Sequence, residues 1–461
     1  MGRLDIAGGT MTISTTACIW DTPGTLVQLS GGTLNVNALD TKGNPAHFQW
    51  TGGTLNLGNP GGLAVGAFGT LGEFVTLSPS SNLMTPVLEI NSDGEVALAG
   101  GSVTVDTFTN NGVLTMASGK LDTAVLGIGN DGTLTGGTGT GSATVSGGSV
   151  VAGAVYLGST AGGTGNMVVS GSGDLTAGRL AANDFVVDGG TVTVLASSIG
   201  FNPVLDGSLV AGYLHDGAII VHAGSVDVPR LNIGVTSGQT GSYVQTGGTV
   251  TAATVRLGHD TAPGADPAIG NAHISGGTLT TDLLAVGTAE GGVGRFDWSV
   301  GTIGVQALTM AGDATLGITL AGTTSGVDYA PLEVDGSATL TGTLDISRAE
   351  GYAPQAGDTF VILTFDAHTG TFANVTGLTA GPGLLFHVKY NVNDVTLVVG
   401  PPAPGDCDAD GDVDLTDYSA FANCLNGPLG GIGASCGCAD FDEDGDVDLY
   451  DAAAFQASRS N

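Results

Sequence analysis

Apolar and polar residues alternate in short runs through the first 305 residues of the chain. Each run follows a phrase of two small residues, usually Gly-Gly, then Thr or Ser, then an aliphatic residue. In Thr33-Leu34-Asn35-Val36 the apolar positions have a period of two, which is typical of a strand with one buried face. A second alternating run often ends in an aliphatic residue and glycine, as in Val255-Arg256-Leu257-Gly258. The pattern predicts short strands joined by glycine turns.

The phrase recurs at a regular distance along the chain. Copies with their second residue at Gly9, Gly32 and Gly53 are 23 and 21 residues apart, and the unit is about 24 residues long. One such unit cannot bury its own apolar face, so units must stack, with paired strands about 4.8 Å apart. We expect residues 1–305 to be all-β and to form a right-handed parallel β-helix, a β-solenoid of about twelve coils and roughly 55–60 Å. A set of antiparallel β-sandwiches is the alternative.

The glycine-rich repeats have a counterpart among known families. The segment Gly241-Ser242-Tyr243-Val244-Gln245-Thr246-Gly247-Gly248-Thr249-Val250 resembles the β-helical repeats of bacterial autotransporter passengers and related surface proteins. Residues 306–400 lose the Gly-Gly phrase and resemble the C-terminal passenger segment that closes such a helix. Because an open strand edge must be covered, we expect residues 306–400 to form a β cap. Residues 401–404, with three prolines, are expected to be a stiff linker.

Two twelve-residue acidic loops follow the linker, 34 residues apart. Both have aspartates at positions 1, 3, 5, 7, 9 and 12 and glycine at position 6. Ca²⁺ prefers six to eight oxygen ligands, and EF-hand-type loops supply them at this spacing, with a backbone carbonyl at position 7. The expected metal residues are Asp406, Asp408, Asp410, Asp412, Asp414 and Asp417, and Asp440, Asp442, Asp444, Asp446, Asp448 and Asp451. The sequence predicts two calcium ions, with Asp412 and Asp446 binding through their backbone oxygens.

A helix is expected after each loop, since apolar residues there have helical spacing. These residues are Leu415, Tyr418, Phe421 and Leu425, and Leu449, Ala452 and Phe455. The two loops also hold 13 of the 43 acidic residues of the chain. Like-charge repulsion at that density opposes folding unless cations are bound.

A duplicated loop and helix with Asp at position 12 is similar to the dockerin module. The resemblance covers residues 405–456, and we take residues 405–461 as a small α-helical, calcium-binding module. It implies that two calcium ions order the module and that it docks onto a cohesin-like domain of a scaffold or surface protein. It also implies partner contacts at loop positions 10 and 11, which are Leu415, Thr416, Leu449 and Tyr450. A place in the helix core is the alternative for Leu415 and Leu449.

Four of the five cysteines, Cys407, Cys424, Cys436 and Cys438, lie within this module. Such crowding is typical of a disulfide-stapled extracellular module, with a four-cysteine zinc site as the alternative. Of the three possible disulfide connectivities we favour Cys424 with Cys436 and Cys407 with Cys438. We therefore expect an extracellular or cell-surface protein. Since Met1 runs directly into a repeat without a signal peptide, we expect the native N-terminus to lie further upstream.

Charge and composition restrict the functions that remain. With 43 acidic and 10 basic residues the formal charge is −33, which argues against a nucleic acid or an anionic membrane surface as partner. No apolar run is long enough for a membrane-spanning helix. The favoured function is a non-catalytic structural or adhesive rod, with extracellular polysaccharide as a candidate ligand, tethered through the docking module.

The alternative function is a polysaccharide lyase or glycoside hydrolase delivered by the same module. We expect no catalytic residues, because His259-Asp260 is the nearest thing to a site and fits an exposed loop. Trp298, beside Asp297, is expected to pack in the core rather than to stack on a sugar.

Overall fold

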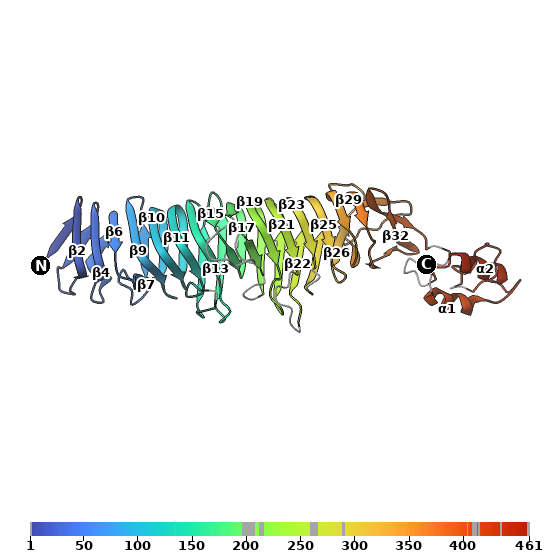
Figure 1. Ribbon diagram of the computed structural model, residues 1–461, viewed down its shortest axis with the longest axis horizontal. Helices are drawn as coiled ribbons and strands as arrows, with labels where there is room; N and C mark the ends of the chain where they lie inside the picture. Colours follow the sequence, from blue (N-terminus) through green and yellow to red (C-terminus); the bar gives the residue numbers. More distant parts are fainter. Residues whose placement is uncertain are drawn as a thin grey trace. The chain divides into compact units, whose positions relative to one another are not determined.

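Strands make up most of the chain, and two short helices lie near its C-terminus (Figure 1). The computed structural model describes residues 2–133, 135–195, 208–211, 216–258, 266–287, 291–402, 404–407, 413, 415–433 and 436–458. The chain divides into two compact units, Met1–Asp297 with Gly301–Thr315, and Trp298–Val300 with Leu316–Asn461. No helix in the described ranges is long and apolar enough to cross a membrane. The predicted domain boundaries at residues 305 and 400 stay predictions.

The bounds of the elements up to residue 310 are as follows. The first strands are β1 Arg3–Ile6, β2 Thr10–Cys18, β3 Leu26–Leu29, β4 Thr33–Asp40, β5 Phe48–Trp50, β6 Gly53–Leu57, β7 Leu63–Val65, β8 Phe74–Leu77, β9 Ser81–Ile90, β10 Glu95–Asn110, β11 Val113–Ile128 and β12 Thr140–Val145, with the 3-10 turn η1 Pro45–His47. The next are β13 Ser149–Leu157, β14 Thr164–Ser170, β15 Asp174–Ala177, β16 Leu180–Ala182, β17 Asp184–Val194, β18 Ser208–Ala211, β19 Gly217–Ile233, β20 Thr240–Gln245, β21 Thr249–Leu257, β22 Ile269–Ile274, β23 Thr278–Val286, β24 Val293–Trp298 and β25 Thr302–Met310.

Strand pairing in the first unit is parallel in the described residues. A small sheet has the order β1-β3-β5, and the other strands of this unit belong to a closed, barrel-like sheet. Paired strands are about one repeat unit apart in the sequence: Thr33 on β4 pairs with Thr54 on β6, and Thr249 on β21 pairs with Thr278 on β23. The repeat read from the sequence is therefore the step from one paired strand to the next.

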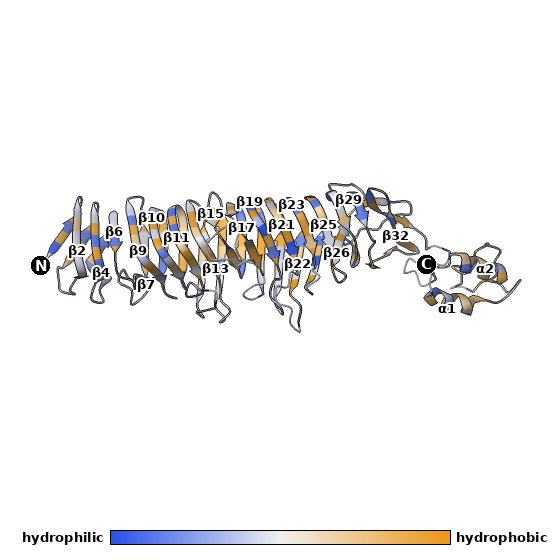
Figure 2. Cartoon of the chain, in the orientation of Figure 1, coloured by the Kyte–Doolittle hydropathy of each residue, from blue (hydrophilic) through white to orange (hydrophobic). Residues whose placement is uncertain are grey.

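The aliphatic residue of the repeated phrase, together with the residues in register with it, forms a continuous buried column. Along the strands apolar and polar positions alternate (Figure 2). Each member of the column pairs with the next and is at most 2% exposed. The members are Leu34, Leu55, Leu83, Val103, Leu121, Val150, Leu175, Val192, Val226, Val250, Leu279 and Ile303. Full burial of an aliphatic side chain stabilises by roughly 1.5–3 kcal/mol, so this column is a main source of stability.

The glycines of the phrase meet a steric requirement between neighbouring strands. Gly53 and Gly277 have φ of +85° and +77°, in the left-handed region that side chains avoid. A Cβ at Gly53 would lie 2.7 Å from the carbonyl oxygen of Gly32, and one at Gly277 would lie 2.5 Å from that of Gly248. Both the turn and the close approach of the next turn therefore require glycine.

The last strands of the second unit pair antiparallel, and both helices follow them in the sequence. Its elements are β26 Thr315–Leu320, β27 Leu332–Thr339, β28 Thr343–Arg348, β29 Thr359–Thr369, β30 Asn374–Thr376, β31 Thr379–Gly381, β32 Leu384–Tyr390, β33 Asp394–Gly400, α1 Leu415–Cys424 and α2 Leu449–Ser458. β27 and β29 pair in parallel, whereas β33 pairs antiparallel with both β29 and β32. The helices expected after the two acidic loops are confirmed.

The residues considered for sugar chemistry are accounted for as far as the structure describes them. Trp298 is 1% exposed, and its indole N–H donates to the Ala330 carbonyl at 2.8 Å. The packing role expected for Trp298 is therefore confirmed. His259 and Asp260 lie outside the described residues.

Candidate calcium site

Six aspartates of the second acidic loop, residues 440–451, converge in two groups. One carboxylate oxygen from each of Asp440, Asp442 and Asp444 lies within 4.8 Å of the others, and the same holds for Asp446, Asp448 and Asp451. The alternate spacing of the first three places them on one side of the loop. All the side-chain donors are oxygens, the ligand type that Ca²⁺ prefers.

Backbone amides hold these carboxylates in place. Asp440 accepts hydrogen bonds from the amides of Asp444 at 3.2 Å and Gly445 at 3.1 Å, so the loop turns back on its first residue. Asp448 accepts from the amide of Tyr450 at 2.7 Å, which caps the first turn of α2. These hydrogen bonds fix the shape of the loop around its carboxylates.

The aspartate at position 12 closes each loop through the same contact. Asp451 is 1% exposed and accepts from the amides of Phe441 and Asp448, both at 2.7 Å. In the first loop the fully buried Asp417 accepts from the amide of Cys407 at 2.6 Å. In both loops, therefore, the carboxylate at position 12 holds the amide at position 2. In the sequence, only the spacing of the two residues could have pointed to this hydrogen bond between positions 12 and 2.

The first loop is only partly described. Asp406 at position 1 is 1% exposed, in keeping with an inward-facing ligand. Asp408, Asp410, Asp412 and Asp414 lie outside the described residues. The metal residues named from the sequence stay predictions for both loops.

The charges of the second loop fit a bound cation. Slight desolvation by the surrounding loop, and then the negative charges of Asp444, Asp451 and Asp440, raise the pKa of the exposed Asp442 carboxyl. Residues 405–461 contain 13 acidic residues and one basic residue, Arg459, so most of this charge has no offset within the module. One carboxylate oxygen of Asp446, which is 5% exposed, has no hydrogen-bond partner. Uncompensated buried oxygens of this kind fit Ca²⁺, whose binding would supply the missing positive charge.

A small apolar core joins the two loop-helix halves. It consists of Val413, Phe421, Ala439, Val447 and Phe455, and the Phe421 and Phe455 rings lie 4.8 Å apart. Val413 and Val447 both occupy position 8 of their loops, so the halves pack as duplicates.

Both helices carry exposed apolar side chains, among them Leu415 and Leu449, for which the sequence left two roles open. Leu415 and Tyr418 on α1 are 65% and 53% exposed, and Leu449 and Tyr450 on α2 are 79% and 77% exposed. The helix-core alternative for Leu415 and Leu449 is therefore wrong. The side chain of Thr416 lies outside the described ones.

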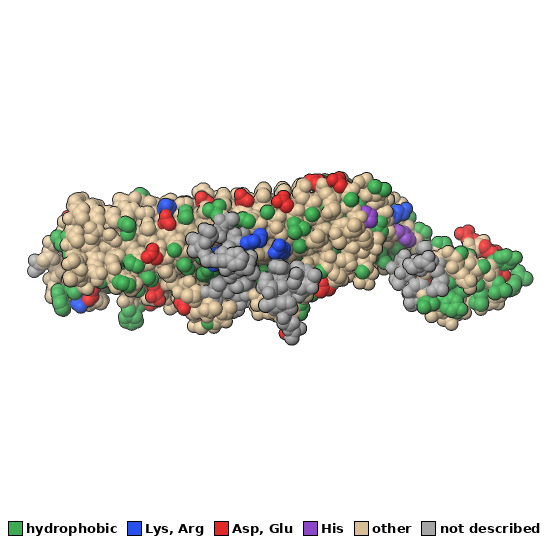
Figure 3. All heavy atoms as spheres, viewed as in Figure 1, with side chains coloured by type: hydrophobic (Ala, Val, Ile, Leu, Met, Phe, Trp, Pro, Cys, Tyr) green, Lys and Arg blue, Asp and Glu red, His purple; other side chains and the backbone are tan. Residues whose placement is uncertain are grey.

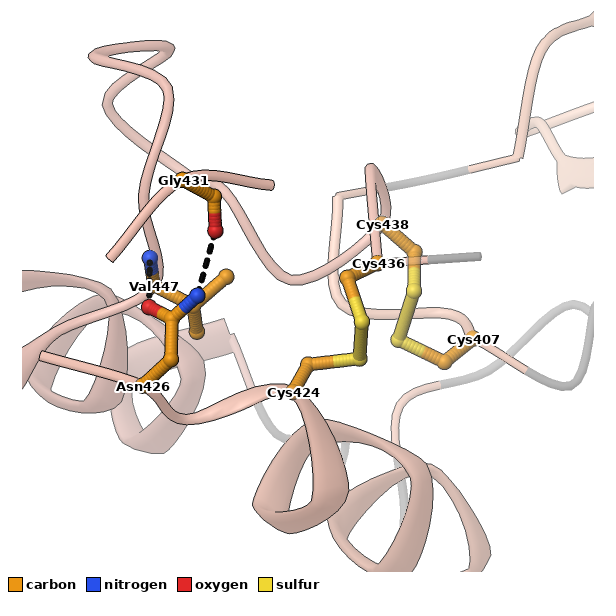
Figure 4. The surroundings of a disulfide bond; sticks show 7 residues. All are labelled: Cys407, Cys424, Asn426, Gly431, Cys436, Cys438 and Val447. Carbon is orange, nitrogen blue, oxygen red and sulfur yellow. Dashed lines mark hydrogen bonds between the residues drawn. A yellow bond between two sulfur atoms is a disulfide. The ribbon is translucent and has the colours of Figure 1, made fainter. Parts of the chain in front are cut away.

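Two disulfides brace the module, as Figure 4 shows. Cys407 is bonded to Cys438, with 5.3 Å between their Cα atoms, and Cys424 to Cys436, with 5.5 Å. These are the pairs favoured from the sequence, and they leave no thiolate of the four for zinc. Beside them Asn426 accepts a hydrogen bond from the amide of Val447 at 3.3 Å, which ties the end of α1 to the second loop (Figure 4).

Removing the disulfide between Cys424 and Cys436, which closes the shorter loop, is expected to destabilise the module. A bond that closes a loop of 12 residues limits the unfolded chain, so Cys424→Ala with Cys436→Ala should lower the free energy of unfolding by roughly 2–3 kcal/mol. Calorimetry of the whole chain in calcium should show the module melting earlier. The exposed free Cys18 is the control, because Cys18→Ala should shift nothing. Equal melting temperatures for all three proteins would contradict a bracing role.

Comparison with known proteins gives one match. Residues 404–457 match the family model of the dockerin type I domain. Dockerin domains bind calcium and dock to cohesin, and proteins that contain them are typically extracellular or at the cell surface. The dockerin resemblance is thereby confirmed. Searches of curated proteins and of solved structures found no match to this chain.

Proposed function

We propose that this chain is a non-catalytic β-solenoid that its dockerin module attaches to a cohesin-like domain on a secreted scaffold or a surface protein. One observation carries the proposal. Asp417 and Asp451 close two loops of the same design, beside helices that leave large apolar side chains exposed. Calcium bound in these loops would fix the two helices, and the helices would present the docking surface.

Two calcium ions fit the duplication of the module. The loops are 34 residues apart and share both the acidic spacing and the contact from position 12 to position 2. A single ion would leave one of these acidic loops without a compensating charge.

The docking surface comprises Leu415, Thr416, Leu449 and Tyr450. A hollow of about 400 Å³ lined by Leu415, Tyr418, Phe455 and Gln456 adjoins it. Exposed apolar side chains also gather on the C-terminal module in Figure 3. Large exposed apolar side chains of this kind are typical of a protein–protein contact.

For the repeats we propose a right-handed parallel β-helix that residues 306–400 cap. The pairing of Val226 with Val250, 24 residues on, supports it, because a coil that returns to its start pairs with itself one repeat later. Crossovers between parallel strands of one sheet are right-handed in nearly all proteins. A stack of this kind would serve as a structural or adhesive rod.

Docking should need both calcium and the apolar side chains of α2. The full chain should bind at least one member of a panel of purified cohesin domains in millimolar Ca²⁺ and none in chelator. Leu449→Ala with Tyr450→Ala should raise Kd at least ~10-fold, since exposed aromatic and aliphatic anchors carry most interface energy. Val392→Ala is the control, because Val392 is 83% exposed but lies in the predicted cap. Calcium-independent binding, or an unchanged Kd in the double variant, would contradict the proposed docking function.

The non-catalytic role has its own test. The full chain is incubated with pectins, alginates and sulfated glycans, and product release is measured. We expect none. Turnover that a single carboxylate substitution in the solenoid abolishes would replace the rod with the polysaccharide lyase or glycoside hydrolase alternative.

A further inference from the structure

Leu429 stands out on the segment between the two calcium loops. Its side chain is 96% exposed, and its backbone has a φ of +69°, in the left-handed region. Among the described residues other than glycine, only Lys42 and Glu443 share this region. A branched apolar residue is disfavoured both by this backbone and by full exposure to water.

The surrounding contacts hold this unfavourable conformation. The amide of Leu429 donates to a carboxylate oxygen of Asp446 at 2.5 Å. Asn426 donates its side-chain amide to the carbonyl of Gly431, and the disulfide between Cys424 and Cys436 closes the segment at both ends (Figure 4). Backbone strain that neighbours fix in this way is concentrated at functional sites.

The segment offers an apolar surface within an acidic module. No residue from Leu425 to Gly433 carries a charge. Leu425 and Ile432, four residues before and three residues after Leu429, are 46% and 43% exposed, so the segment presents three apolar side chains to solvent. A partner that covers this surface must itself be apolar there.

The segment begins where the docking helix ends. Leu425 directly follows α1, which carries the exposed Tyr418, and is itself 46% exposed. The hydrogen bond from the Leu429 amide to the Asp446 carboxylate also ties the segment to position 7 of the second calcium loop. The same calcium-dependent fold thus presents both α1 and Leu429.

We propose that Leu429, flanked by Leu425 and Ile432, is a second anchor for the cohesin-like partner and inserts into an apolar pocket of that domain. The inference rests on the docking function proposed above. A lipid surface is a poor occupant, because the module, residues 405–461, has 13 acidic residues and a single basic residue, Arg459, to attract one. The alternative that a second copy of the chain covers Leu429 is one of the outcomes of the experiment below.

Two substitutions at one position separate anchoring from folding. Leu429→Asn removes the apolar side chain but keeps a residue that tolerates left-handed backbone, and Leu429→Met keeps the apolar bulk. Binding of the full chain to the cohesin domain that the wild type binds is measured by calorimetry. Leu429→Asn should raise Kd at least ~10-fold and Leu429→Met less than ~3-fold. Calcium binding should be the same in all three proteins.

The outcomes distinguish this inference from the function on which it rests. If the wild type binds no cohesin domain of the panel, both are overturned. If the wild type binds and Leu429→Asn binds equally well, the second anchor is wrong and the docking function stands. Wild-type dimers in light scattering that Leu429→Asn abolishes would make a second copy the occupant, and this too would overturn the proposal.

Discussion

Asp451→Ala is expected to weaken calcium binding at the second loop more than ~100-fold, beyond the 10–100-fold that loss of a supporting contact costs. Two effects add up in this variant. The expected bidentate ligand is lost, and the amides of Phe441 and Asp448 lose the carboxylate that closes the loop. Calcium titration of the full chain by calorimetry should fall from two bound ions to one.

Glu443→Gln is the matched control for charge. Glu443 is an exposed acid of the same loop at position 4, which supplies no calcium ligand. The Glu443→Gln substitution removes one negative charge, as Asp451→Ala does, but should change the calcium affinity less than ~3-fold, since exposed charges interact weakly. Equal losses in both variants would mean that net charge, rather than ligation at position 12, governs binding.

Gly277→Ala should destabilise the repeat region by roughly 3–5 kcal/mol, the largest stability effect expected outside the calcium loops. The new methyl group would meet the Gly248 carbonyl oxygen at 2.5 Å, and alanine would have to adopt a φ of +77°. Neither residue 277 nor the Gly248 carbonyl can move alone, because both belong to backbone that leads directly into paired strands. Urea denaturation, followed by far-ultraviolet circular dichroism of the β signal, measures the loss.

Gly304→Ala, on β25 of the same unit, is the control for the loss of a glycine. A Cβ at Gly304 would meet no atom within 4 Å, and its φ lies outside the left-handed region. This variant should stay within about 1 kcal/mol of the wild type or gain stability, because alanine limits the unfolded chain. A comparable loss in the two variants would contradict the stacking of glycine on carbonyl.

The repeat register was within reach of sequence reasoning because burial there follows a local rule. Leu34 and Leu279 stand after the glycine phrase at positions of period two, and the structure pairs their column throughout. The sequence revealed only one of the two reasons why these positions require glycine. A turn needs its positive φ, but the contact of Gly277 with Gly248 arises between strands far apart in the sequence.

Helical periodicity alone did not decide burial in the C-terminal module. Leu415 and Phe421 belong to one apolar stripe, yet Leu415 is 65% exposed and Phe421 is 2% exposed. Helices of ten residues have room for few core contacts, and the packing of Phe421 on Phe455 uses them. The strained Leu429 gave no signal, because its conformation depends on Asp446, 17 residues further along the chain.

Hydrogen exchange of the intact chain, read peptide by peptide in millimolar Ca²⁺ and in chelator, addresses the coupling of cation and fold without cutting the molecule. The amides of α1 and α2 should be protected with calcium and should exchange at least ~100-fold faster without it, while those of β10 and β11 stay unchanged. Protection of both helices that is the same under the two conditions would contradict a tail folded by calcium.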